Sequence, residues 1–362
     1  MGGPLPQTWH VELFEAPFTP ELWASYEKVT RSYGCTREFT EHFERPVGAT
    51  LAFVRSEGEE AAFMYRIHAE GSARVLGRFT APSAGALGAF ADAVFARHPG
   101  VRIVRTGLVD ALPDVRVIGR PALTVREDVE LRIALPSSVA EYERRLGKRF
   151  LSRARYYERL LARERPAARL TVHERDEIPR ALVAEVVRLN RERVAAKGAR
   201  SVFDEGYEEG ISRVARAHGL AVILRDEDRV CAGAIDIHCG SEAFSWVVGY
   251  DATYARYHPG RLCDLEAVRR AIERGIRTYH LLHGDSRHKR DLGGQPARLA
   301  SYAILRSWSA ARPADVGRTC GVHIARLARR LIARADRWMA RGYGRTPLKA
   351  LARAIARPLR AR

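Results

Sequence analysis

The alternation of hydrophobic and polar residues is most regular in the second half of the chain. Apolar residues recur at helical spacing in two basic stretches, residues 140–163 and 178–196, and Ser137 and Ser138 precede the first as candidate N-caps. Three strand-like runs separated by turn residues follow, at residues 220–226, 229–239 and 242–251. The pattern predicts two helices and then an antiparallel meander.

The segment Tyr257-His258-Pro259-Gly260 interrupts this strand pattern. Behind it, apolar residues repeat at spacings of three and four up to Gly275, which predicts an amphipathic helix. The repeating residues are Leu262, Leu265, Val268 and Ile272. A buried strand over residues 277–284 and a last strand over residues 298–307 complete the predicted order.

The first half of the chain repeats this order of elements. Residues 51–79 have the pattern of three strands, with Gly58 and Gly71 at the turns. Residues 85–97 then have the period of a helix, and residues 101–109 that of a strand. We expect the two halves to share a fold, as internal repeats do; the alternative is a chance likeness between generic strand–turn–strand patterns.

The distribution of charge separates a basic tail from a nearly balanced body. The formal net charge of the 362 residues is +18, which taken alone favours nucleic acid as a partner. Residues 1–135 carry 15 Lys and Arg against 17 Asp and Glu, residues 136–305 carry 31 against 24, and residues 306–362 carry 15 against 2. The excess therefore lies mainly in the tail and says little about the chemistry of the body.

Cysteine usage and hydropathy bear on the compartment. The five cysteines are scattered, with no CxxC pair and no Cys/His spacing typical of a metal site. The N-terminal residues lack the basic and apolar regions of a signal peptide, and no segment approaches the roughly 18 apolar residues of a membrane span. We therefore expect no metal and a cytoplasmic, reducing compartment.

The tail contains two basic amphipathic stretches, residues 322–341 and 346–360. Apolar residues fall on one stripe of each, arginines flank the stripe, and Trp338 belongs to the first. Helices of this kind bind an anionic membrane surface, such as the inner face of the cell membrane. The alternatives are that the stripe packs against the body, or that the arginines contact nucleic acid.

A helix that begins at Pro259-Gly260 directly after a strand leaves its first N–H groups without partners inside the helix. These groups and the positive end of the helix dipole favour an anion such as a pyrophosphate. Arg256 precedes this helix start and Arg261 lies in its first turn, so both would add to the attraction. The other interpretation is ordinary turn chemistry, in which Pro-Gly is common.

This part of the chain resembles the GNAT-type domain of the CelD-like and FemAB-like acyltransferases. The resemblance covers roughly residues 140–306 and rests on Gly249-Tyr250-Asp251, on the loop and helix from Tyr257 onward, and on the strand that runs into Gly284-Asp285 and Lys289. It implies an α+β protein of tandem GNAT-like domains, in which a mixed sheet is flanked by helices. The implied parts are a degenerate domain over residues 1–135, a catalytic domain over residues 136–305, and a basic helical tail over residues 306–362.

The resemblance also implies a cofactor and site residues. In that family the loop-to-helix segment lies where the pyrophosphate of coenzyme A is held, which implies that acetyl-CoA contacts Arg256, Gly260, Arg261 and Leu262. A Tyr-Lys pair after the following strand lies close to the reacting groups. The lysine corresponds to Lys289, whereas His288 stands where the family has tyrosine.

Acyl transfer from a thioester needs a held donor, a deprotonated nucleophile, and positive charge or N–H groups facing the developing oxyanion. Lys289 suits the last task, or the binding of a substrate phosphate. The candidates for the general base are Asp236, His238, His283, Asp285 and His288. Alternation along their strand puts Asp236 and His238 on one face, where polar residues are costly unless paired. Each candidate also has an ordinary structural explanation, such as a turn cap for Asp285.

The remaining patterns narrow the function. The chain has no Ser-His-Asp order, HExxH, Walker loop or GxGxxG, which argues against most hydrolases, metalloproteases, kinases and dehydrogenases. In the first half, Gly107–Leu112 offers no cation where the second half has Gly284–Lys289, so we expect the first copy to be a scaffold or a substrate wall.

The sequence thus predicts an acetyltransferase that transfers an acetyl group from acetyl-CoA to an amine or hydroxyl. CelD-like relatives imply a sugar, a polysaccharide precursor or another cell-envelope intermediate as the acceptor. One alternative is a Fem-like transferase that uses aminoacyl-tRNA, although no long heptad-patterned arm is found in the second half. The other is a non-catalytic protein that binds a membrane surface.

Overall fold

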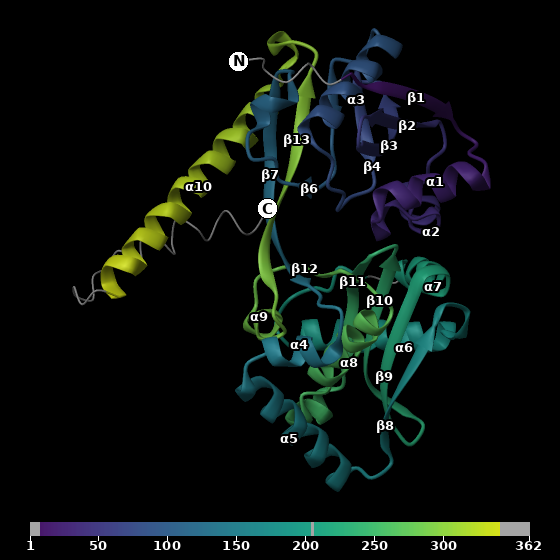
Figure 1. Ribbon diagram of the computed structural model, residues 1–362, viewed down its shortest axis with the longest axis vertical. Helices are drawn as coiled ribbons and strands as arrows, with labels where there is room; N and C mark the ends of the chain where they lie inside the picture. Colours follow the sequence, from purple (N-terminus) through teal and green to yellow (C-terminus); the bar gives the residue numbers. More distant parts are fainter. Residues whose placement is uncertain (1–7, 204–205, 341–362) are drawn as a thin grey trace.

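One sheet runs through the whole body of the protein (Figure 1). The computed structural model describes residues 8–203 and 206–340. Over these residues thirteen strands pair in the order β1-β2-β3-β4-β5-β13-β7-β12-β11-β10-β9-β8, with β6 beside β13. Helices cover the sheet, which confirms the predicted α+β class with a mixed sheet.

The first half contains the predicted three strands, helix and strand. Gly58 and Gly71 form the two turns with φ of +77° and +74°, as their positions in the sequence predict. The elements are β1 (His10–Glu15), α1 (Pro20–Thr30), α2 (Arg37–Phe39), β2 (Ala49–Ser56), β3 (Glu59–His68), β4 (Ser72–Leu76), α3 (Ala84–Arg97), β5 (Ile103–Arg105), β6 (Val109–Asp110) and β7 (Ala122–Ala134).

The second half contains the predicted antiparallel meander, helix and two further strands. The elements are α4 (Val139–Arg145), α5 (Lys148–Glu164), β8 (Ala168–Glu174), α6 (Arg180–Ala195), α7 (Tyr207–His218), β9 (Gly219–Asp226), β10 (Arg229–Cys239), β11 (Glu242–Tyr250), α8 (Pro259–Glu273), β12 (Thr278–His283), α9 (Arg287–Asp291) and β13 (Gln295–Leu305).

Two details differ from the predicted elements. The single helix expected over residues 140–163 is two helices, because Leu146 adopts an extended conformation (φ −70°, ψ 136°) before Gly147. Ser138 caps the first of them by accepting a hydrogen bond from the Glu141 N–H, as predicted. Several elements were missed, among them β1, α1, α2 and β7 in the first half and β8 and α7 in the second. Strand β8 extends the meander beside β9, and α7 joins α6 in covering it.

The two halves repeat one arrangement and exchange their last strands. Strands β2, β3 and β4 are antiparallel neighbours and β5 pairs in parallel with β4; β9, β10, β11 and β12 follow the same rule. However, β7 ends the first half and pairs with β12, whereas β13 ends the second half and pairs with β5 and β7. The boundaries expected at residues 135 and 305 lie directly after β7 and β13 in the chain. Because each of these strands pairs with a strand of the other half, the two halves share one sheet.

Aromatic residues of the first half complete the core beneath the meander. The Tyr33 ring lies 5.2 Å from the Phe244 ring and 5.3 Å from the Trp246 ring, between centroids. Phe39 and Phe79 belong to the same buried cluster as the apolar side chains of α6. Burial of aromatic side chains on this scale holds the two halves together.

The tail begins as one long helix, α10 (Pro313–Ala340), which extends away from the body (Figure 1). Asp315 anchors its start through two hydrogen bonds from Arg105, of 2.8 and 2.7 Å. Further along, Ile324 and Leu327 are 56% and 58% exposed, so the apolar stripe does not pack against the body there. Among the described helices, none combines the length and apolar content needed to cross a bilayer. The stretch predicted at residues 346–360 lies outside the described residues.

Candidate functional site

A large cleft opens where two neighbouring strands of the second half diverge. Strands β11 and β12 pair in parallel only over Glu242–Phe244 and Thr278–His280, although both continue beyond these residues. Beyond the paired part lies a cleft of about 1140 Å³. Its walls come from the end of β11, the start of α8, the segment after β12, α6, and the first half of the chain.

The start of α8 faces this cleft. His258 precedes the helix in the left-handed conformation (φ 49°, ψ 49°) and makes no side-chain capping hydrogen bond. Gly260 lies against Tyr250, where a Cβ atom would come within 3.2 Å of the ring. His258, Gly260 and Arg261 all line the cleft. Pro259 has no N–H, and the Arg261 and Leu262 N–H groups donate to the His258 carbonyl oxygen at 2.9 and 3.3 Å. The helix start therefore presents its dipole and the Gly260 N–H to the cleft, as an anion site requires.

The residues predicted to hold coenzyme A separate into two groups. Gly260 and Arg261 line the cleft, and the Arg261 guanidinium lies 5.2 Å from the centre of the Phe150 ring. Arg256 instead pairs with Glu164 and donates a 2.7 Å hydrogen bond to the Tyr257 hydroxyl, outside the cleft lining. Leu262 is 3% exposed and packs in the core beneath α8, so only its backbone remains for a ligand.

Lys289 reaches from α9 back to the end of β12. Its ammonium donates hydrogen bonds to the carbonyl oxygens of Leu282 (3.3 Å) and His283 (2.5 Å). Burial lowers the pKa of Lys289, against the opposing effect of the Asp264, Glu130 and Asp285 carboxylates. An ammonium group has three N–H donors, so one donor remains beyond these two carbonyls, and the side chain lines the cleft.

His288 and Asp264 form a hydrogen-bonded pair in the cleft. The His288 Nε2 atom lies 2.6 Å from the Asp264 Oδ2 atom. Asp264 is 6% exposed, whereas the His288 side chain is 34% exposed. An ionised carboxylate can only accept a hydrogen bond, so the Nε2–H group of His288 donates to Asp264, and in the neutral ring Nδ1 is then the basic nitrogen. This is the arrangement that a general base needs.

The other predicted bases lie in less suitable surroundings. Asp236 is fully buried in β10 and accepts a hydrogen bond from the Tyr279 hydroxyl; burial raises the pKa of Asp236 well above its usual value. Burial, reinforced by the Arg175 charge, lowers the pKa of His238 to about 4. Neither side chain is among the cleft lining. Asp285 pairs with Arg290 on the surface, and this hydrogen bond lowers the pKa of Asp285.

His283 links the cleft to the exchanged strand β7. Its Nδ1 atom lies 3.1 Å from the Asp128 Oδ2 atom, and its ring lies 5.2 Å from the Phe79 ring. Burial alone would raise the pKa of Asp128, but hydrogen bonds from His283 and the Val129 N–H, with the Arg126 charge, lower it to about 2. His283 is thus paired with a carboxylate, and its side chain is 47% exposed.

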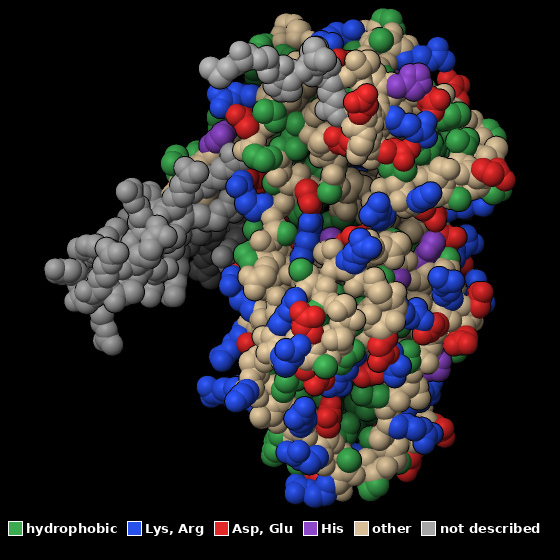
Figure 2. Space-filling view, viewed as in Figure 1, with side chains coloured by type: hydrophobic (Ala, Val, Ile, Leu, Met, Phe, Trp, Pro, Cys, Tyr) green, Lys and Arg blue, Asp and Glu red, His purple; other side chains and the backbone are tan. Residues whose placement is uncertain are grey.

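The first half supplies one wall of the cleft, which the sequence had only hinted at through the expectation of a substrate wall. The lining side chains from this half are Tyr33, Phe39, Phe43, Glu44, Arg66, Arg74, Arg78 and Arg126. Figure 2 shows Lys and Arg side chains spread over the visible surface of both halves. Within the described lining, eight Lys and Arg residues stand against the two carboxylates Glu44 and Asp264, so the cleft favours anionic ligands.

Asp264 and the aromatic wall were missed by the sequence reasoning. One signal for Asp264 was present: it precedes Val268 by four residues, which places a charge beside the apolar face of the predicted helix. Tyr33 and Phe39 lie far from the rest of the site in the chain, and their pattern is that of ordinary core residues.

Comparisons with known proteins agree with this geometry. Residues 148–290 match the family model described as "Acetyltransferase (GNAT) domain". No curated protein sequence matches the chain. Among solved structures, FemX is similar with a TM-score of 0.58 at 11% identity, over 81% of this chain and 97% of that chain.

Two further structures extend over both halves. The C-terminal domain of a putative lysylphosphatidylglycerol synthetase from Agrobacterium fabrum matches with a TM-score of 0.52 at 15% identity, over 83% of this chain and 95% of that chain. A conserved protein of unknown function from Bacteroides thetaiotaomicron matches with a TM-score of 0.51 at 12% identity, over 82% of this chain and 100% of that chain. The chain therefore has a GNAT, FemAB-like fold, as the sequence predicted, and carries a GNAT-type acyltransferase domain.

Proposed function

We propose that this chain, with its GNAT, FemAB-like fold, transfers an acetyl group from acetyl-CoA to an amine or hydroxyl group of a sugar, polysaccharide precursor or other cell-envelope intermediate. The observation that carries the proposal is the meeting, in one cleft, of an uncapped helix start, a His288–Asp264 pair and Lys289. These features supply the anion site, the base and the positive charge that acyl transfer requires.

The donor has a natural place in the cleft. The pyrophosphate of coenzyme A would lie at the first turn of α8, where the Gly260 backbone and Arg261 face the cleft. Its extended arm would then run between the diverging strands β11 and β12. This direction brings the thioester toward the end of β12, where Lys289 and His288 lie.

His288 acts as the base in this proposal. Its Nδ1 atom takes the proton from the acceptor amine or hydroxyl as the nucleophile attacks the thioester carbonyl, and Asp264 stabilises the imidazolium that forms. The tetrahedral intermediate then collapses with release of the coenzyme A thiolate. The imidazolium returns its proton to this leaving group, so no net proton remains on the protein.

Lys289 acts near the developing oxyanion. Two of its N–H donors hold the carbonyl oxygens of Leu282 and His283, which fixes the end of β12. The third donor, in a site where burial already lowers the pKa of the ammonium, is available to a negative oxygen. Arg290, the next residue, pairs with Asp285 on the surface and serves as its matched control.

The acceptor enters from the side of the first half. Its wall combines the Tyr33, Phe39 and Phe43 rings with four arginines, and such a wall suits a ligand that has both a ring or acyl part and negative charge. A cell-envelope intermediate that carries a sugar ring or acyl chain together with a phosphate would match this wall. The long basic helix α10, with Ile324 and Leu327 exposed, would bring the enzyme to an anionic membrane surface.

A second donor, aminoacyl-tRNA, is favoured by one observation. The similarity to FemX extends over both halves and 97% of that chain, and the described cleft lining is strongly basic. Binding of a tRNA acceptor end by these cations would depend steeply on salt.

Calorimetric titration of the full-length protein at moderate salt distinguishes the donors. We expect acetyl-CoA to bind at one site, and Lys289→Ala or Arg261→Ala to weaken binding while Arg290→Ala does not. Absence of acetyl-CoA binding together with tight, salt-dependent binding of aminoacyl-tRNA would transfer the proposal to the tRNA donor. Absence of both would refute it.

A further inference from the structure

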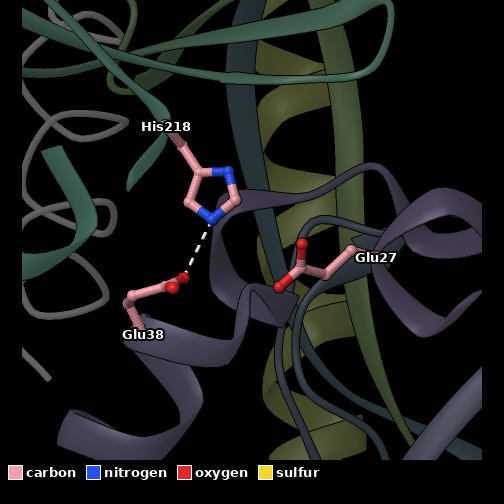
Figure 3. A group of neighbouring side chains, drawn as sticks. All are labelled: Glu27, Glu38 and His218. Atoms are coloured by element: carbon pink, nitrogen blue, oxygen red, sulfur yellow. Dashed lines mark hydrogen bonds and ion pairs between the residues drawn. The ribbon is translucent and has the colours of Figure 1, made fainter. Parts of the chain in front are cut away.

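Two carboxylates and an imidazole meet where the first half packs against the second, away from the residues that line the cleft. Glu27 lies on α1, Glu38 on α2, and His218 is the last residue of α7. One potential ligand atom from each lies within 4.8 Å of the other two. Figure 3 shows the three side chains turned toward one another. All three are half-buried, so their charges are only partly screened by water.

The contacts within the group leave negative charge unbalanced. The His218 Nε2 atom lies 2.9 Å from the Glu38 Oε2 atom, and the Glu27 Oε1 atom accepts the Arg37 backbone N–H at 2.7 Å. The Arg37 side chain turns instead to Glu41, to which its Nε atom donates a 2.8 Å hydrogen bond. Burial and the neighbouring Glu38 carboxylate raise the pKa of Glu27, as expected when two carboxylates share a partly dry space.

We propose that Glu27, Glu38 and His218 bind one divalent transition-metal ion, with Zn²⁺ as the best-fitting ion. Carboxylate oxygen and imidazole nitrogen bind Zn²⁺ at about 2.0–2.2 Å, and three protein ligands with one water complete a tetrahedron. Ligand atoms in such a tetrahedron are about 3.3 Å apart. The group needs only small side-chain rotations to reach this spacing, because its atoms already lie within 4.8 Å.

The ion would join the two halves beside the cleft. Two ligands come from helices of the first half and the third from α7 of the second half. Phe39 follows Glu38 directly, and both Phe39 and Tyr33 line the cleft wall. An ion at this position therefore fixes the segment that carries the wall. The inference is independent of the proposed acyl transfer.

The site departs from the sequence-based expectation of no metal. That expectation used the close spacing of ligands typical of zinc motifs. Here Glu38 and His218 are 180 residues apart in the chain, so no local spacing predicts them.

Titration of the metal-stripped, full-length protein with ZnCl₂ tests the site. We expect one Zn²⁺ per chain by calorimetry, and a concentration-dependent rise in Tm because the ion binds only the folded state. Glu38→Gln and His218→Gln each remove one ligand and should weaken binding at least about tenfold. Glu41→Gln, on the same short segment but paired with Arg37, should change the Kd less than about twofold.

The outcomes are distinct. Circular dichroism and the Tm without metal establish that each variant folds, and Glu27→Gln replaces any variant that does not. A wild-type protein without a saturable one-to-one site refutes the proposal. Equal Zn²⁺ affinity in the wild type, Glu38→Gln and His218→Gln also refutes it, since the ion would then lie elsewhere.

Discussion

The two halves of the protein share one arrangement but differ at the point where its central strands part. In the second half β11 and β12 diverge into a cleft of about 1140 Å³. In the first half the equivalent strands β4 and β5 enclose a cavity of only about 10 Å³. Main-chain contacts continue past the paired residues there, since the Phe79 N–H donates to the Leu108 carbonyl oxygen at 2.6 Å. The Asp110 N–H likewise donates to the Thr80 carbonyl oxygen at 2.9 Å, so main-chain contacts close the gap between the strands that stays open in the second half.

The two halves also differ at the start of the helix that follows the meander, which is α3 in the first half and α8 in the second. Helix α3 begins with Ser83, whose side chain accepts a 3.0 Å hydrogen bond from the Ala86 N–H. Helix α8 begins with His258, which makes no such bond. The Ser83 side chain thus satisfies a donor of α3, whereas at the start of α8 the Arg261 N–H donates to the His258 carbonyl oxygen at 2.9 Å and the Gly260 N–H is left for a ligand. This difference supports the proposal that the second copy binds the donor, and the expectation that the first copy is a scaffold or a substrate wall stays a prediction.

The largest expected effect concerns the proposed base. His288→Gln should lower kcat/KM for acyl transfer about 10²–10⁴-fold, because the proton acceptor is lost while the fold is kept. Steady-state kinetics with Arg290→Ala as the control measures this effect. Retention of full activity in His288→Gln would remove His288 and Asp264 from the mechanism.

In the first half, the segments that follow β4 and β5 lie close together, and their backbones approach each other at Gly77 and Gly107. A Cβ atom at Gly107 would lie 2.4 Å from the Gly77 carbonyl oxygen, whereas one at Gly100 would meet nothing within 4 Å. We expect Gly107→Ala to lower the free energy of unfolding by about 1–3 kcal/mol. Urea denaturation should show a much smaller change in the free energy of unfolding for Gly100→Ala. Equal changes in the two variants would mean that the backbone segments at Gly77 and Gly107 are not tightly packed.

Asp128 ties the exchanged strand β7 to His283 at the cleft. Its pKa is lowered to about 2 in the fold, so its contribution to stability is present above pH 3.8, the ordinary value, and is lost as the pH falls toward 2. Asp128→Asn should reduce the free energy of unfolding by about 1–2 kcal/mol at pH 7. The difference from the wild type should shrink between pH 4 and pH 2.

Denaturation at several pH values checks this prediction. Asp92→Asn, which alters an exposed pair with Arg120, is the control and should show a smaller difference. A gap between wild type and Asp128→Asn that stays constant with pH would contradict the assignment.

The smallest effect concerns the capped helix. Ser83→Ala removes the cap of α3 and should cost about 1 kcal/mol of stability without changing the binding of acetyl-CoA. Ser152→Ala, at an exposed position inside α5, is the matched control. Weakened acetyl-CoA binding in Ser83→Ala would mean that the first copy also holds the donor.

Much of this architecture was predictable because it is local. The meander, α8 and the repeat follow from period and turn residues, and both Gly58 and Gly71 occupy the positive φ that their turns require. The strand exchange was not predicted, because no strand was expected over β7, and the partners of β7 and β13 lie in the other half, which no local pattern specifies.

The site was predictable only in part for the same reason. Gly260 and Arg261 at the start of α8, and His288 and Lys289 just after β12, were found from local patterns, and all four line the cleft. Asp236 and His238 are two residues apart, as expected for neighbours on one face of a strand. Both are buried in the fold and neither lines the cleft, and their catalytic role stays a prediction. The wall from the first half depends on how the halves pack, which no pattern within either half specifies.

Hydrogen exchange of backbone amides with and without acetyl-CoA tests the difference between the halves most directly. We expect slower exchange at residues 258–264 and 282–289 on addition of the donor, and no change at residues 80–87 and 106–110. Slower exchange in the first-half segments, with none at α8, would contradict the claim that the second half alone holds the donor.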